Sequence, residues 1–163
     1  MSAAGALAIA AQGDRELVLT RGFDAPRALI FLAMTTPDLI RQWLLGPPGW
    51  SMPVCRIDLR PGGAYRYVWR LDDGDMEMGV GGSFRDVVPP ARLVHTERFD
   101  QAWYPGEAVL TTRLEERDGR TGLTVTILYE TAAARDAVLQ SPMEQGIRAS
   151  YDRLDAMLAS QAA

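Results

Sequence analysis

A histidine and a glutamate stand two residues apart in a strand-like segment of this chain. His95 is the only histidine, and Glu97 has the same parity as Leu93 and Phe99. Because alternate residues of a strand face the same side, the pair should lie on one face of a sheet. An imidazole and a carboxylate placed so could hold a proton for general acid or base catalysis. The alternative, which we favour, is a hydrogen-bonded structural histidine without a catalytic part.

Aromatic residues alternate in the segment 56–70, which reads RIDLRPGGAYRYVWR. Tyr65, Tyr67 and Trp69 share one face of the predicted strand. A face this aromatic requires a helix or a ligand to cover it. Aromatic side chains with polar tips, together with flexible methionines, suit an apolar ligand that carries a few oxygen atoms.

The predicted ligand-binding residues come from several segments of the chain. They are Tyr65, Tyr67, Trp69, Met76, Met78, His95, Trp103, Tyr104, Met143, Ile147 and Tyr151. The alternative is that these side chains fill an ordinary hydrophobic core and leave no cavity, because parity predicts direction and not empty volume.

Other catalytic signals are lacking in the sequence. The single cysteine, Cys55, excludes an internal disulfide, and its strand-like surroundings predict a small buried hydrophobe. One cysteine and one histidine far apart do not form a metal cluster or favour a nucleophile pair. All 17 basic residues are arginines, so a lysine Schiff base is excluded. With no phosphate loop or dinucleotide fingerprint, we expect no cofactor and no metal.

Length and composition indicate one globular domain. The chain has 163 residues, of which 47% are apolar and 23% charged. Its net charge of −4 argues against a nucleic-acid partner. No apolar run approaches the roughly 20 residues that a membrane span needs. Residues 1–14 lack the basic start of a signal peptide and predict a flexible tail. The single cysteine, which can form no internal disulfide, predicts a reducing, cytoplasmic location.

The remaining segments predict one continuous antiparallel sheet with helices at either end of the chain. A strand at 16–23 precedes two short helices, at 25–34 and 36–44, each with a proline in its first turn. Six strands with short connections follow: 51–60, 64–71, 76–88, 92–99, 107–116 and 121–130.

The period changes to that of a helix near the C-terminus. A short helix is predicted at 132–139 and a long one at 141–160. In the long helix, Met143, Ile147, Tyr151, Leu154 and Leu158 recur at helical spacing. This amphipathic helix can cover the concave face of the sheet, and the folded domain is predicted to span residues 15–160.

In their order and spacing, these elements resemble the SRPBCC superfamily, which is also called START-like or birch-pollen-allergen-like. Within it, the chain is similar to the group named after the activator of the 90-kDa heat-shock protein's ATPase. The segments that carry the resemblance are AP (25–26), TPD (36–38), DLRPGG (58–63), GSF (82–84), VVPP (87–90), RLV (92–94), GLT (122–124), MEQG (143–146) and YDRL (151–154).

The resemblance implies an α+β helix-grip fold, in which a seven-stranded antiparallel sheet curves around a long C-terminal helix, with two short helices after the first strand. In relatives, a cavity between sheet and helix holds lipids, sterols, polyketides or other apolar molecules. The fold also hosts transporters, enzymes and chaperone activators. The co-chaperone that gives the group its name has an additional domain for which this chain has no room, so a chaperone partner is disfavoured.

Three functions remain open at this point. We favour binding of a small apolar or amphipathic molecule in an internal cavity, with no catalysis of the protein's own. The second is an enzyme of the polyketide cyclase or dehydratase type, with His95 as acid or base and Tyr65, Tyr67 or Tyr151 orienting a carbonyl. The third is an interaction module, either co-chaperone-like or a homodimer.

Overall fold

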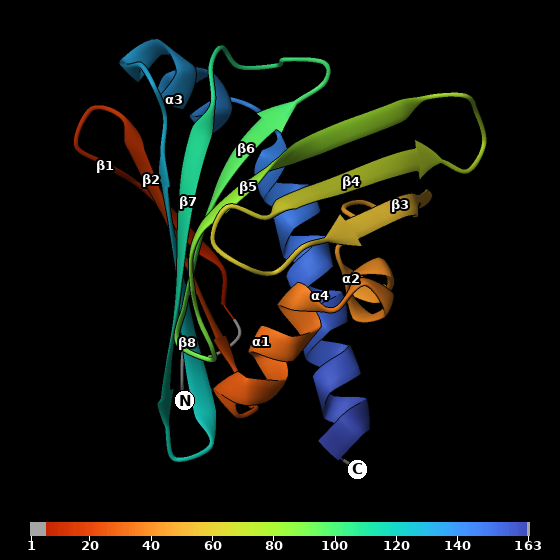
Figure 1. Ribbon diagram of the computed structural model, residues 1–163, viewed down its shortest axis with the longest axis vertical. Helices are drawn as coiled ribbons and strands as arrows, with labels where there is room; N and C mark the ends of the chain where they lie inside the picture. The colour runs from red at the N-terminus through yellow and green to blue at the C-terminus, as the bar shows by residue number, and fades with distance from the viewer. Residues whose placement is uncertain (1–5, 163) are drawn as a thin grey trace.

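One antiparallel sheet of eight strands forms the frame of the molecule. The computed structural model describes residues 6–162, and the strands follow the order β1-β2-β8-β7-β6-β5-β4-β3. Figure 1 shows the sheet curved around the long helix α4. The strands are β1 (Ala8–Gln12), β2 (Glu16–Phe23), β3 (Trp50–Ile57), β4 (Ala64–Leu71), β5 (Glu77–Val88), β6 (Arg92–Phe99), β7 (Ala108–Arg117) and β8 (Arg120–Leu128).

Four helices complete the fold. They are α1 (Arg27–Thr35), α2 (Pro37–Trp43), α3 (Ala132–Leu139) and α4 (Met143–Ala162). Pro26 occupies the N-cap of α1 and Pro37 the first turn of α2, where a missing N–H costs nothing. Thr131 caps α3 by accepting a hydrogen bond from the Ala134 amide. The expected α+β class and the long C-terminal helix are therefore confirmed.

The sheet has eight strands and not the predicted seven. The additional strand, β1, lies within the predicted flexible tail 1–14 and pairs with β2 from Ala8↔Thr20 to Gln12↔Glu16. Gly13, with a φ of +58°, allows the turn between the two strands. Four of the five β1 residues are exposed, so their sequence lacks the alternation that predicts a strand. Residues 1–5 of the predicted tail lie outside the described residues.

Close strand packing accounts for a glycine in β5. The register of β5 shifts between Phe84 and Asp86, beyond the glycines at positions 79, 81 and 82. At Gly82, a Cβ atom would overlap the carbonyl oxygen of Thr96 on β6. Glycine is required there because the neighbouring backbone occupies the place of a side chain.

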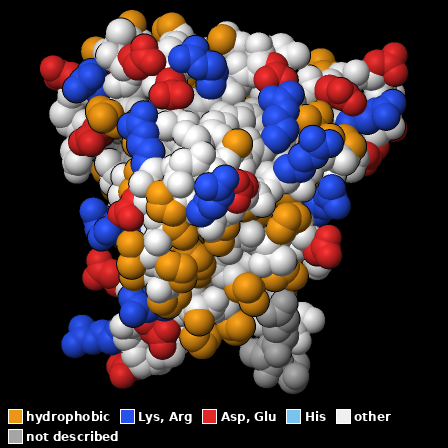
Figure 2. Space-filling model, in the orientation of Figure 1, with side chains coloured by type: hydrophobic (Ala, Val, Ile, Leu, Met, Phe, Trp, Pro, Cys, Tyr) orange, Lys and Arg blue, Asp and Glu red, His pale blue; other side chains and the backbone are white. Residues whose placement is uncertain are grey.

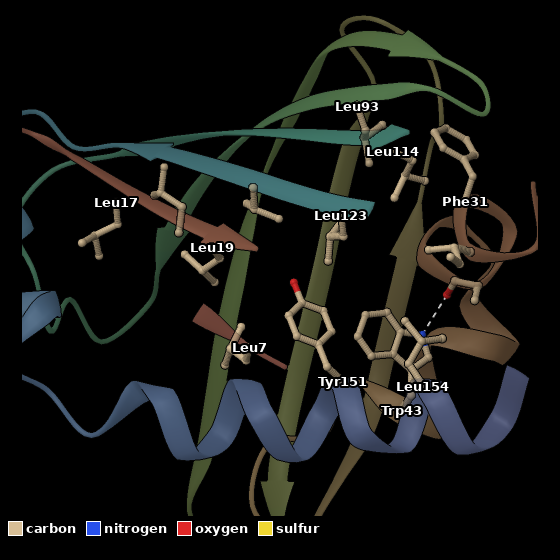
Figure 3. Close-up of a cluster of buried hydrophobic side chains, with 14 of the residues drawn as sticks. Leu7, Leu17, Leu19, Phe31, Trp43, Leu93, Leu114, Leu123, Tyr151 and Leu154 are labelled. Atoms are coloured by element: carbon tan, nitrogen blue, oxygen red, sulfur yellow. Dashed lines mark hydrogen bonds between the residues drawn. The ribbon is translucent and has the colours of Figure 1, made fainter. Parts of the chain in front are cut away.

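The hydrophobic core lies between the inner face of the sheet and α4. Figure 3 shows Tyr151 and Leu154 of α4 directed toward strand residues that include Leu19 and Leu123. The Trp43 ring stacks on Tyr151 at 6.0 Å between centroids, and its Nε1 donates a hydrogen bond to the Ala33 carbonyl oxygen. These contacts attach α4 to the two short helices as well as to the sheet.

Packing is tighter along the C-terminal half of α4 than along its N-terminal half. On the face that meets the core, Tyr151, Leu154 and Leu158 are buried, whereas Met143 and Ile147 are only partly buried. The buried Arg21 of β2 also bonds Asp152 of α4, with 2.8 Å between Nη1 and Oδ1. The sheet therefore holds the helix most firmly from Tyr151 onward.

The outer surface mixes both signs of charge. In Figure 2, hydrophobic side chains gather in the lower half of the view, over and beside α1, where Leu32 is 52% exposed. The possible homodimer and the expected lack of a chaperone partner both remain predictions. Within residues 6–162, no helix combines the length and the apolar character needed to span a membrane.

We expect Gly82→Ala to destabilise the protein by about 1 to 3 kcal/mol, because the added methyl group must displace the Thr96 backbone. The matched control is Gly122→Ala in β8, where the nearest heavy atom to the added methyl group would be 3.9 Å away. The control should be neutral or slightly stabilising. Urea unfolding of both variants makes the comparison, and equal midpoints would contradict this account of Gly82.

Candidate functional site

Glu97 lies near the middle of the sheet, between two residues with little or no side chain. On the adjacent strand β7, Glu97 pairs with Ala108. On the other side, the pairing of Gly81 with Arg98 places Gly82 opposite Glu97. Tyr65 of β4 pairs with Gly82 in turn. Because paired residues share a face, Glu97 is flanked by a glycine and an alanine, with a tyrosine beyond the glycine.

A first group of aromatic rings, the strand group, extends along β4 beside Glu97. Tyr65 contacts Tyr67 at 5.0 Å between ring centroids, and Tyr67 contacts Trp69 at 6.1 Å. Tyr65 also meets His95 edge to face at 5.2 Å. Its hydroxyl donates a 2.6 Å hydrogen bond to the Thr96 carbonyl oxygen, which fixes the ring against β6.

A second group of rings, the loop group, approaches Glu97 from the connection between β6 and β7. Phe99, Trp103 and Tyr104 contact one another at 5.2 to 6.0 Å between centroids. Tyr104 also meets Tyr129, which directly follows β8, at 5.2 Å and a right angle. The Tyr104 hydroxyl donates a 2.9 Å hydrogen bond to Oε2 of Glu97. Glu97 is therefore the point at which the two aromatic groups meet.

The surroundings of Glu97 disfavour its negative charge. Burial raises the pKa of Glu97 from 4.5 to about 7, although the hydrogen bond from Tyr104 lowers it in part. Burial, followed by the charge of Glu97, also raises the pKa values of Tyr65 and Tyr129. Within residues 6–162, Glu97 forms no ion pair with an arginine. Such perturbed groups concentrate at functional sites.

His95 faces the same interior as Glu97 and stays neutral there. It pairs with Phe84 on one side and Leu110 on the other. Burial lowers the pKa of His95 to about 4, so the imidazole carries no charge at neutral pH. Its Nδ1 atom is inaccessible and has no hydrogen-bond partner within the described part of the chain. The favoured expectation of a hydrogen-bonded histidine is therefore wrong for this nitrogen.

The possible proton-sharing pair of His95 and Glu97 does not form. Both residues lie within the described range, yet no hydrogen bond or ion pair joins them, and the carboxyl group takes its hydrogen bond from Tyr104 instead. Side chains two apart on a strand stand side by side without pointing at each other. The two side chains nevertheless face the same side of the sheet, and they differ in charge: the imidazole is neutral at neutral pH, whereas the carboxyl group can ionise.

The other predicted site residues lie in different surroundings. Trp69 donates a hydrogen bond from Nε1 to the Leu44 carbonyl oxygen, and Met78 pairs with it on β5. Met143 and Ile147 pack against the core from α4. Tyr151 is stacked on Trp43 in the tightly packed region, and Met76 is 58% exposed near the β4–β5 turn. Their contribution to ligand binding remains a prediction.

Sequence reasoning missed the small residues beside Glu97 and the ring of Tyr129. Parity placed Glu97 near His95, but the positions of Gly82 and Ala108 depend on the register between strands. The bulge between Phe84 and Asp86 shifts that register by one residue. The available signal was a glycine and an alanine in facing strands, which becomes informative only after the strands are aligned.

Two hollows lie on the outer surface of the molecule. One, of about 540 Å³, lies beside the start of α4 and is lined by Pro142, Glu144, Gln145, Arg148, Ala149 and Asp152. The other, of about 510 Å³, is lined by Arg27, Glu115, Glu116 and Asp118. Neither includes a residue of the two aromatic groups. Among residues 6–162, no cluster of three or more histidine, cysteine, aspartate or glutamate residues could hold a metal ion.

Comparisons with known proteins agree with this architecture. The family model for "Activator of Hsp90 ATPase homolog 1-like protein" matches residues 24–159. A crystal structure of a Rhodobacter sphaeroides protein is 33% identical, with a TM-score of 0.87, and the match covers 94% of this chain and 99% of that one. No curated protein matches the chain.

Two more distant structures show the same fold. A Nitrosomonas europaea protein is 22% identical, with a TM-score of 0.80, over 93% of this chain and 99% of that one. The AHSA1-like protein from Aeromonas hydrophila is 20% identical, with a TM-score of 0.69, over 86% and 93% of the two chains. The predicted superfamily and the helix-grip fold are thereby confirmed.

The pKa of Glu97 predicts how the stability of the protein changes with pH. Because its pKa in the folded protein lies above the ordinary 4.5, the folded state binds this proton more tightly than the unfolded chain does. The stabilisation of the fold by this bound proton is complete below pH 4.5 and is lost as the pH rises through 7. The loss should amount to roughly 3 kcal/mol.

We therefore expect the stability of the wild type to fall relative to Glu97→Gln between pH 4 and pH 8. Urea unfolding at several pH values measures the difference. Glu115→Gln, at an exposed position of β7, controls for the removal of a carboxylate. If the difference in unfolding free energy between the wild type and Glu97→Gln stays constant over this pH range, Glu97 has an ordinary pKa and the prediction is wrong.

Proposed function

The chain belongs to the Activator of Hsp90 ATPase homolog 1-like family, and we propose that it binds one small apolar or amphipathic molecule inside the fold. The site would lie between the inner face of the sheet and the N-terminal half of α4. Its lining would include the strand group, the loop group, His95 and Glu97. The buried thiol of Cys55 suits a reducing compartment, and we propose a cytoplasmic location.

One observation carries this proposal. The pKa values of His95 and Glu97 are shifted strongly by burial, yet both side chains keep part of their surface accessible. A group in a filled core would have no such surface, and a group on the outside would not be desolvated. A side chain that is both desolvated and accessible is expected beside a small enclosed space.

The packing of α4 supports the same position. Met143 and Ile147, near the start of the helix, are only partly buried although they pack against the core. On the opposite side, Tyr67 and Phe99 are also partly buried. Incomplete burial of large apolar side chains on both facing surfaces favours a ligand space there, because a close-packed interior would cover them.

The chemistry of the lining indicates the class of ligand. Aromatic rings from Tyr65, Tyr67 and Trp69 offer apolar area, and Glu97 and His95 offer a few polar contacts. Pockets for small organic molecules commonly combine a mostly apolar wall with a small number of placed polar groups.

A catalytic function is the second candidate, and one observation favours it. His95 is uncharged at neutral pH and can therefore accept a proton from a bound molecule. A cyclase or dehydratase would use this property. Once a ligand is identified, its conversion by the wild type and by His95→Gln separates the two functions: loss of conversion in the variant would support catalysis.

Native mass spectrometry of gently purified protein is the direct test of binding. We expect an adduct of a few hundred daltons that is released on denaturation, and extraction would give its chemical class. If the protein is isolated empty, soaking with N-phenyl-1-naphthylamine, a neutral apolar fluorophore, tests the space itself. No adduct and no fluorophore binding would refute the proposed function.

We expect Tyr67→Ala to weaken fluorophore binding about tenfold or more, because it removes one of the largest ring surfaces of the strand group. Leu32→Ala is the control, since Leu32 is exposed on α1 and belongs to neither aromatic group. Fluorescence titration measures both affinities, and circular dichroism verifies folding. Equal losses in the two variants would place the fluorophore outside the proposed site.

A further inference from the structure

We infer that the ligand of this site carries a cationic amine, which the Glu97 carboxylate binds among the surrounding tyrosine rings. This inference rests on the function proposed above and specifies its ligand class. It depends on the neighbours of Glu97 in the sheet, on the hydrogen bonds that are already made, and on the charges within reach.

Glu97 keeps part of its surface accessible, although most of the residues around it are buried. Gly82 has no side chain, and the Thr96 backbone occupies the place of one, while Ala108 has only a methyl group, which is buried. Neither residue places a large side chain against the carboxyl group. Larger rings, all of them buried, pack on both sides: Tyr65 beyond Gly82, and Tyr104 with Tyr129 at the other side. The charge of Glu97 acts on all three rings, which places them around the carboxyl group.

The hydrogen bonds of the site leave an acceptor free. Tyr65 directs its hydroxyl hydrogen to the Thr96 carbonyl oxygen, and Tyr104 directs its own to Oε2 of Glu97. Within residues 6–162, no other side chain or backbone group donates to the Glu97 carboxyl group. Its Oε1 therefore remains available to a ligand that donates hydrogen bonds, which an ammonium group does.

Charge favours the same class of ligand. Glu97 has no arginine partner within the described residues, and burial keeps His95 neutral, so the protein supplies no cation here. A desolvated carboxylate without a counter-charge is costly, and a bound ammonium group would lower that cost. An anionic ligand would instead meet a negative charge without compensation.

The rings add a second attraction. The faces of tyrosine rings carry negative electrostatic potential and attract cations within about 6 Å. Tyr104 and Tyr129 stand at 90° to each other, with 5.2 Å between their centroids, and both are buried, so a cation held by the Glu97 carboxyl group would lie close to two rings that are shielded from water. Aromatic rings combined with a carboxylate distinguish an ammonium group from a neutral alcohol of the same size.

The test compares three probes that share one apolar chain: 1-decylamine, 1-decanol and decanoate. Displacement of N-phenyl-1-naphthylamine at pH 8 measures their affinities for the wild-type protein, for Glu97→Gln and for Tyr104→Phe. We expect the amine to bind the wild type at least tenfold more tightly than the alcohol, and decanoate to bind most weakly. Glu97→Gln should abolish the preference for the amine, whereas Tyr104→Phe should retain it.

The outcomes separate this inference from the proposed function. Equal binding of amine and alcohol by the wild type, or a preference for decanoate, would overturn the inference and leave the ligand space intact. A preference for the amine that persists in Glu97→Gln would overturn the assignment to this carboxylate. Failure of all three probes and of the fluorophore would overturn the proposed function itself. Circular dichroism and thermal unfolding verify that both variants are folded.

Discussion

The attachment of α4 along only part of its length is the constraint on which the interior depends. Trp43 stacks on Tyr151, Arg21 bonds Asp152, and the Ser150 hydroxyl accepts a hydrogen bond from the Gly46 amide, so each of these anchors lies at or beyond residue 150. Because a helix is stiff, fixing one end of α4 also fixes the distance between its other end and the sheet. The partly buried Met143 and Ile147 lie in that region, where the width between helix and sheet is set by remote contacts.

Glu97 is costly for a fold of this kind. A carboxyl group near the middle of a sheet loses its hydration, and the one hydrogen bond from Tyr104 replaces only part of it. A leucine at this position would bury apolar area without the electrostatic penalty. Structures retain such groups where a ligand or a reaction uses them, which links the unfavourable environment of Glu97 to function.

The sequence predicted the architecture well because local signals agreed with one another. Prolines in the first turns of α1 and α2, the alternation of Tyr65 with its neighbours, and the helical spacing from Met143 to Leu158 each indicated the element that forms. It failed for β1, whose small exposed residues carry no alternation. It also failed for the neighbours of Glu97, since one bulge in β5 decides which residue lies opposite, and local sequence does not reveal strand register.

The fold and the proposed ligand class therefore depend on different residues. Structures that are 20 to 22% identical preserve the sheet and the helix, so the architecture tolerates wide variation in the residues that cover it. The ligand class that we infer depends instead on a few interior positions: a carboxyl group with one donor, two small neighbours and three tyrosine rings. A bulky residue at Gly82 would overlap the Thr96 backbone, and one at Ala108 would have to enter a fully buried position, so both positions require small residues. In the site that we propose, specificity would depend on these small neighbours as well as on the charge of Glu97.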